Sequence, residues 1–180
     1  MVNDSLPELI TLTDYKGDWF PYLEAIYQYY LNEVVNGKLL YNNLPISCQF
    51  RPSYEGKGFA FWHAISEGAK EDDRKADLRR CERIRWIAWT IRNTTDNTNN
   101  RVTWWENKRG SNTHTVLFLE EESYVVILAK RKDYYLFRTA YCANPKRKRQ
   151  LIRERDEYWK TKRLKAPVRT PPDALSTHGR

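Results

Sequence analysis

The side chains best placed for chemistry lie in residues 125–141, a stretch predicted to form two strands joined by a tight turn at Lys132-Asp133. This turn would place Lys130 opposite Tyr135 and Val126 opposite Thr139. One face of the hairpin would then carry Lys130, Tyr135, Phe137, Thr139 and Tyr141, with Arg138 on the other face. A lysine, a threonine and a tyrosine at one end of a hairpin can handle a phosphate group, although the same residues also occur at ordinary strand ends.

His63 is the best single candidate for proton transfer, because an imidazole titrates near neutral pH. Residues 59–66 alternate as a strand does, which places His63 on one face with Phe59, Phe61 and Ile65. A structural histidine within a strand remains the alternative. His114 lies beside a loop, where a structural role is expected.

The sequence supports no cofactor and no metal ion. It contains no phosphate-cradling glycine loop, no HExxH, no GxSxG and no paired carboxylates. The remaining basic set suits cleavage of RNA by its own 2′-hydroxyl. That reaction needs a base, an acid for the leaving 5′-oxygen and cations around the phosphorane, and histidine, tyrosine, lysine and arginine can supply all three.

The charge balance favours a polyanionic partner. The chain has 180 residues with 31 Lys+Arg against 23 Asp+Glu, a net charge of +8 and a pI near 9.4. RNA or DNA is preferred to a membrane surface, since no basic amphipathic helix or lipidation signal is evident. The candidate phosphate contacts are Lys130, Arg83, Arg109, Arg138, Lys146 and Arg147. Ordinary solvated charges are the alternative for each of them.

Lys146 and Arg147 open a basic run that extends to Arg149, at the start of an expected final helix. Positive charge there opposes the helix dipole unless an anion is nearby. Such a local conflict is typical of functional sites.

Cysteine usage and the termini predict a cytoplasmic protein. Cys48, Cys81 and Cys142 are far apart and odd in number, without zinc or disulfide spacing. The chain begins without a signal peptide and contains no stretch of 18 apolar residues, so no membrane partner is expected.

The expected fold class is α+β, with a single domain over residues 1–165 and a flexible tail over 166–180. Strands at 102–107, 113–119, from 124 and at 134–141 predict a four-stranded antiparallel β-meander. N-terminal helices precede it and a C-terminal basic helix follows. A helix is expected at 19–36, with Asp18 as its cap. The other expected elements are strands at 46–51 and 59–66, a helical stretch at 71–92 in one or two pieces, a polar loop at 93–100 and a final helix at about 144–160.

Several segments, in one order, resemble phage-type members of the barnase/EndoU/colicin/RelE-like (BECR) ribonuclease superfamily. They are the FWHAI string at 61–65, the helix at 77–84, the strand with Trp104, Trp105 and Asn107, the YVVIL, YYL and TAY strings at 124–128, 134–136 and 139–141, and the basic helix. The resemblance covers about residues 20–160.

The resemblance implies a metal-independent endoribonuclease, often a toxin or phage-associated effector. It implies that His63 is the general base or acid and that Thr139 and Tyr141 bind phosphate and handle protons. It further implies that Lys130, Arg138 and Arg83 stabilise negative charge. No second histidine stands in a matched position.

Two other functions fit the same sequence. One is a nucleic-acid-binding module that holds RNA or DNA without cutting it. The other is a basic interaction protein that docks an acidic partner, such as an antitoxin or immunity protein.

Overall fold

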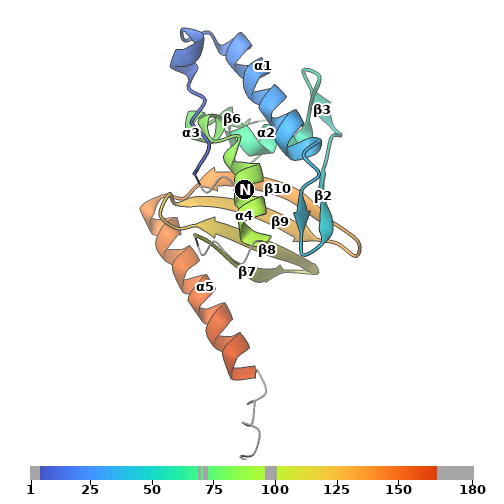
Figure 1. The fold of residues 1–180 in the computed structure, drawn as a ribbon, viewed down its shortest axis with the longest axis vertical. Helices are drawn as coiled ribbons and strands as arrows, with labels where there is room; N and C mark the ends of the chain where they lie inside the picture. Colours follow the sequence, from blue (N-terminus) through green and yellow to red (C-terminus); the bar gives the residue numbers. More distant parts are fainter. Residues whose placement is uncertain (1–4, 69, 71–72, 96–100, 166–180) are drawn as a thin grey trace, which may run out of the picture.

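The structure, a computed structural model, describes residues 5–68, 70, 73–95 and 101–165. It is a mixed α+β fold built on a six-stranded sheet of order β1-β2-β10-β9-β8-β7 (Figure 1). Helices α1–α3 lie toward one end of the long axis, and α5 points toward the other. The proposed flexible tail at 166–180 lies outside the described residues.

The strands of the second half of the chain pair antiparallel with their chain neighbours. They are β7 (Val102–Arg109), β8 (Asn112–Leu119), β9 (Tyr124–Lys130) and β10 (Tyr135–Cys142). Strand β2 (Leu44–Cys48) then joins β10 in parallel, and β1 (Leu40–Tyr41) pairs with β2. The sheet therefore extends beyond the four strands expected from sequence, because a short strand from the first half of the chain joins it.

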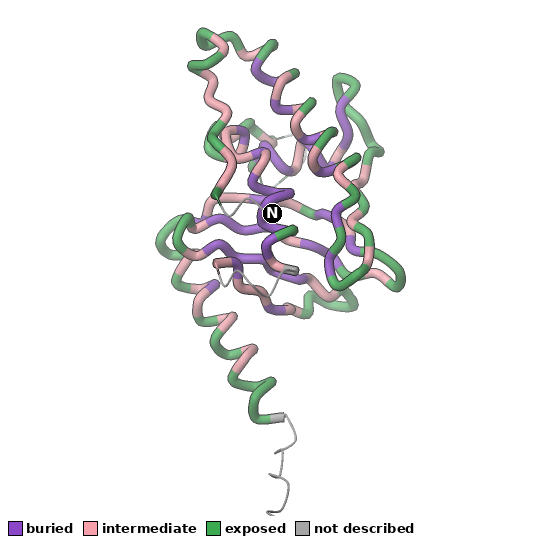
Figure 2. Tube along the Cα trace, in the orientation of Figure 1, coloured by how far each residue is buried: buried purple, intermediate pink, exposed green. Residues whose placement is uncertain are grey.

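One face of the sheet carries the larger core. Helices α1 (Trp19–Tyr30), α2 (Phe59–Ile65) and α4 (Trp86–Thr95) pack their apolar sides against it. The sheet contributes buried side chains such as Leu117, Val126, Tyr135 and Phe137. Figure 2 shows this burial concentrated in the strands and the helices above them.

Helix α5 (Pro145–Lys165) packs on the opposite face. Its Leu151 is buried with Trp105, Val116 and Phe118 in a second, smaller core. The far part of α5 is mostly exposed (Figure 2). Only part of this second face is therefore covered, which leaves room for a cleft beside the start of α5.

The first helix confirms the expected cap. Asp18 Oδ1 accepts a hydrogen bond from the Phe20 backbone N–H at 3.2 Å, and the helix starts at Trp19. A π-helical turn, Leu31–Val35, extends it toward Gly37. None of the described helices combines the length and apolar character that crossing a bilayer requires.

Residues 59–65 form a helix, where a strand was expected over residues 59–66. The buried residues of α2 are Ala60, Phe61, Ala64 and Ile65, a spacing that matches the 3.6-residue turn of a helix. Phe59 and His63, one turn apart, stack with ring centroids at 4.1 Å. The alternation of aromatic residues was misleading, because burial follows the alanines as well.

The helical stretch expected at 71–92 begins later and is broken. Residues 75–76 form a short strand, β6 (Lys75–Ala76), which pairs with β5 (Ser66–Glu67). Helix α3 (Leu78–Glu82) follows, with Asp77 as its cap, and α4 continues to Thr95. The loop expected at 93–100 is therefore helical at its start, and residues 96–100 lie outside the described part.

Smaller differences occur between residues 46 and 58. The strand expected at 46–51 is β2 and ends at Cys48. The loop that follows contains a short ribbon of β3 (Ser53–Tyr54) and β4 (Lys57–Gly58).

A β-bulge in β10 sets which side chains face the second side of the sheet. Lys130 pairs with Tyr135 as expected, but the register shifts between Phe137 and Thr139. Thr139 consequently pairs with Ile127, and Arg138 is the extra residue. Phe137 and Ala140 face the larger core, whereas Thr139 and Tyr141 lie on the other side with Arg138. The expected face assignment is therefore wrong.

Two single deletions in β10 test this register. Deleting Arg138 removes the extra residue and keeps Phe137 and Ala140 on the core face. Deleting Leu136 forces Phe137, which is 1% exposed, out of the core. We expect the Leu136 deletion to lower the free energy of unfolding by at least about 3 kcal/mol more than the Arg138 deletion. Urea unfolding of both variants measures the difference. If the two deletions lower the free energy of unfolding equally, the assigned bulge at Arg138 is wrong.

Candidate functional site

A basic cleft of about 410 Å³ opens on the second face of the sheet, beside the start of α5. Five arginines line it: Arg74, Arg80, Arg109, Arg138 and Arg147. His63, His114, Thr139, Tyr141 and Asn107 also line it, and Glu67 is the carboxylate among the described lining residues. This volume is typical of a small-ligand site, and the excess of positive charge selects an anion.

The floor of the cleft comes from the sheet. His114 on β8 pairs with Asn107 on β7, and Val116 and Ile127 form the apolar floor. The bulge in β10 turns Thr139 and Tyr141 toward the same side. Strand geometry alone thus gathers these side chains from four neighbouring strands.

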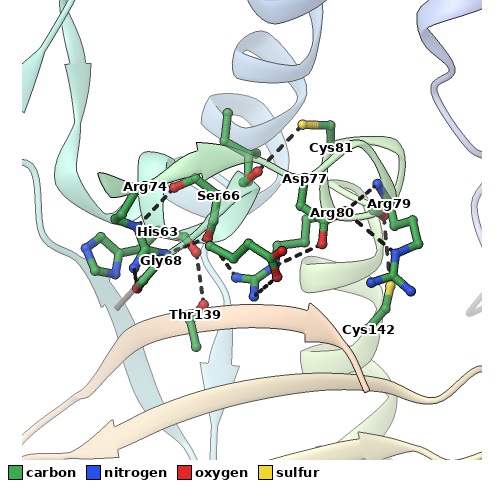
Figure 3. Close-up of polar contacts among 12 residues, drawn as sticks. His63, Ser66, Gly68, Arg74, Asp77, Arg79, Arg80, Cys81, Thr139 and Cys142 are labelled. Atoms are coloured by element: carbon green, nitrogen blue, oxygen red, sulfur yellow. Dashed lines mark hydrogen bonds and ion pairs between the residues drawn. The ribbon is translucent and has the colours of Figure 1, made fainter. Parts of the chain in front are cut away.

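The wall comes from the segment between α2 and α3. Thr139 Oγ1 donates a hydrogen bond to the backbone carbonyl of His63 at 2.9 Å. Thr139 therefore lies beside His63, but the contact uses the His63 backbone. Figure 3 shows the imidazole of His63 pointing away from Thr139. The alternation of residue types predicted a strand at residues 59–66, so it did not reveal this orientation of the imidazole.

Two arginines of this wall are anchored by the chain around them (Figure 3). Arg74 Nη2 donates to the Ser66 carbonyl at 2.5 Å, and its Nε donates to Ser66 Oγ at 3.1 Å. Arg80 Nη1 donates to the same carbonyl at 2.9 Å and lies 5.8 Å from the centre of the Tyr141 ring. Both guanidinium groups are therefore held in place before any ligand binds.

A chain of hydrogen bonds fixes Tyr141 at the α5 end of the cleft. Arg147 Nε donates to the Tyr141 hydroxyl at 3.3 Å, and Arg147 Nη1 donates to Glu154 at 2.8 Å. Asn107 Nδ2 donates to the second oxygen of Glu154 at 2.9 Å. Since Arg147 occupies the tyrosine oxygen as an acceptor, the phenolic proton of Tyr141 is left to donate to another group.

The start of α5 partly resolves the conflict between its basic run and the helix dipole. Asn144 Oδ1 accepts from the Arg147 backbone N–H at 2.8 Å, as an N-cap does. The Arg147 side chain turns to Glu154 and the cleft, while Lys146 is exposed to solvent. Only one of the two residues singled out in this run lines the cleft.

Arg109 and Arg138 are exposed, and no ion pair involves either within the described part of the chain. They differ in this respect from Arg80 and Arg147, which already contact carboxylates. Arg109 and Arg138 are thus the cleft cations best placed to bind a phosphate.

His114 is a cleft residue whose pKa is shifted by its surroundings. Partial burial lowers its pKa below the usual 6.5, and the nearby charges of Arg109, Arg138 and Arg131 lower it further. The lowered pKa favours the neutral imidazole, which can accept a proton. A structural role was expected for His114 because it lies beside a loop. Its arginine neighbours come from three other segments, so its position in the sequence does not reveal them.

The structure brings together six of the nine sequence-predicted site residues: His63, Thr139, Tyr141, Arg109, Arg138 and Arg147. Lys130 lies on the core side of the sheet, 3.9 Å from Glu106. Arg83 lies over the Trp86 ring at 4.9 Å and hydrogen-bonds to the Arg79 carbonyl. Lys130, Arg83 and Lys146 do not line the cleft. Arg74, Arg80, Asn107 and His114 do, and sequence analysis did not single them out as site residues.

The low pKa of His114 can be measured by NMR titration of its imidazole. We expect a pKa below 6.5 in the native chain, and a higher pKa in Arg138→Gln and Arg109→Gln, because each change removes a repelling positive charge. Arg163→Gln, on the far exposed part of α5, is the control and should leave the pKa unchanged. If the pKa of His114 is the same in both variants as in the native chain, this electrostatic description is wrong.

Known proteins give no indication of the function of this chain. No family model matches this chain, and no curated protein or solved structure is significantly similar to it. The cleft and its chemistry are accordingly the basis for inferring function.

Proposed function

We propose that this chain is an endoribonuclease that cleaves RNA through the substrate's own 2′-hydroxyl and leaves a 2′,3′-cyclic phosphate, without requiring a metal ion. One observation carries the proposal: a histidine with a lowered pKa, a hydrogen-bonded tyrosine and five arginines converge on one cleft. These groups supply a base, an acid and positive charge, which this reaction needs.

The phosphate is held by cations. In the proposal, Arg109 and Arg138 contact its non-bridging oxygens, and the anchored Arg74 and Arg80 form the wall behind it. Charge builds on these oxygens as the phosphorane forms, so preorganised guanidinium groups stabilise the transition state more than the substrate.

Proton transfer in the proposal uses His114 and Tyr141. His114 removes the proton from the 2′-hydroxyl as the 2′-oxygen attacks phosphorus. The bond from phosphorus to the 5′-oxygen breaks, and this oxygen takes the proton of Tyr141, whose own oxygen accepts from Arg147. The resemblance instead gives the acid or base role to His63, which also lines the cleft. Variants of both histidines distinguish these assignments.

The likeness to the BECR ribonuclease superfamily is part of this proposal. The α+β architecture, with antiparallel pairing from β7 to β10 and helices from the first half of the chain, is compatible with it. As a biological setting we propose a toxin or phage-associated effector, neutralised by an acidic antitoxin or immunity protein that covers the basic cleft.

Cleavage is tested with purified protein and total RNA in the presence of EDTA. We expect fragments ending in 2′,3′-cyclic phosphate and a rate lowered about 10²- to 10⁴-fold in His114→Ala, because a positioned base is lost. His63→Ala tests the role that the resemblance implies, and a rate equal to the native one would remove His63 from the mechanism. Arg163→Gln should cut at the native rate.

A binding-only module is the second candidate. It is favoured by one observation, since the contact between His63 and Thr139 uses the His63 carbonyl and not its imidazole. RNA that stays intact, yet is retained with an affinity that falls steeply as salt rises, would support this module and overturn cleavage.

The effector role is tested by expression in cells. We expect the native chain to stop growth and the His114→Ala variant, expressed to the same level, to be harmless, because RNA cleavage would be the cause of toxicity. Growth curves with matched protein levels by immunoblot provide the measurement. Normal growth of cells that contain demonstrably active native protein would count against a toxin.

A further inference from the structure

A second pocket, of about 450 Å³, adjoins the basic cleft and has a different chemistry. Three aromatic side chains line it, Tyr54, Phe59 and Trp62, together with Ser66 and Arg74. Ser66 Oγ and Arg74 are hydrogen-bonded to each other, and Arg74 lines the basic cleft as well. An aromatic pocket thus shares a charged wall with the proposed phosphate site.

The aromatic surface continues from this pocket to the cleft. The Phe59 ring lies against the ring of His63, which lines the basic cleft, with ring centroids at 4.1 Å. Arg74 Nη1 also donates to the Gly68 carbonyl at 3.3 Å, which fixes the guanidinium between the two spaces (Figure 3). Neighbouring parts of one extended ligand can therefore occupy both.

The pocket is organised before a ligand arrives. Trp62 Nε1 donates to the Tyr54 backbone carbonyl at 3.0 Å, which ties α2 to the β3–β4 ribbon. The Tyr54 and Trp62 rings are 5.7 Å apart and already in contact, so no third ring fits between them. Tyr54 is nevertheless 65% exposed, which leaves ring surface open to a ligand.

We propose that this pocket holds an unpaired base of single-stranded RNA, next to the phosphate bound in the basic cleft. The inference rests on the proposed ribonuclease function, because it assigns the pocket to a nucleotide adjoining the cleaved bond. Exposed aromatic faces beside a cationic groove are how proteins bind single strands, with each base contributing through stacking. Base-paired RNA presents no free base face and is a poor ligand for this pocket.

The test uses a seven-nucleotide 2′-O-methyl RNA, which cannot be cleaved through a 2′-hydroxyl, and an abasic strand of the same length and charge. We expect Tyr54→Ala to weaken binding of the strand with bases roughly 5- to 100-fold and to leave the abasic strand within about twofold of native. The dependence of affinity on salt should stay the same, because no phosphate contact is lost. Arg138→Gln should instead weaken both strands and reduce the salt dependence.

Two further variants control for the ring and for folding. Tyr54→Phe keeps the aromatic face and should bind as the native chain does. Tyr134→Ala removes another partly exposed tyrosine, which lines neither space, and should also bind normally. Circular dichroism checks that each variant is folded.

The outcomes separate this inference from the proposed function. If Tyr54→Ala binds both strands like the native chain, or loses the same affinity for both, the stacking site is wrong, even if unmodified RNA is cut. If the native chain binds neither strand, the stacking site is also wrong. If binding depends on bases and on Tyr54 but unmodified RNA stays intact, the stacking site holds and cleavage is overturned.

Discussion

The extra residue in β10 is the constraint on which the site depends. Before the bulge, Phe137 fills the larger core and Leu136 pairs with Ser47 on β2. After it, Thr139 and Tyr141 face the cleft, and among the described residues no strand pairs with β10 on its β2 side. Without this shift of one residue, the side-chain period of two would bury both hydroxyl groups among apolar neighbours.

Helices α2 and α3 attach to the sheet along the half of β10 that follows the bulge. The Thr139 hydroxyl binds the carbonyl at His63, and Arg80 spans from the Ser66 carbonyl to the Tyr141 ring. These contacts join α2 and α3 to a strand about 60 to 76 residues away in the chain. This half of β10 therefore contributes Thr139 and Tyr141 to the cleft and also supports the opposite wall.

Repulsion among the arginines of the cleft lowers the stability of the fold and favours the binding of an anion. Arg80 and Arg147 contact carboxylates, which offsets part of their mutual repulsion, whereas Arg109 and Arg138 contact none within the described residues. The same two arginines lower the pKa of His114 by repelling its protonated form. A bound phosphate would relieve this repulsion, which is the physical reason to connect the cleft with a polyanion.

The sequence by itself predicted an α+β fold, the strands from residue 102 onward and the capped helix at Trp19, because these depend on local periodicity and caps. It also singled out His63, Thr139 and Tyr141, all of which line the cleft. Only the tertiary structure made α2 a helix, since burial of Ala60 and Ala64 depends on what packs against them. Only the tertiary structure shifted the register at Arg138 and placed Arg109 and Arg138 beside His114. These three residues lie on three different strands. The spacing of residues along one strand does not determine how close they come to residues of another strand.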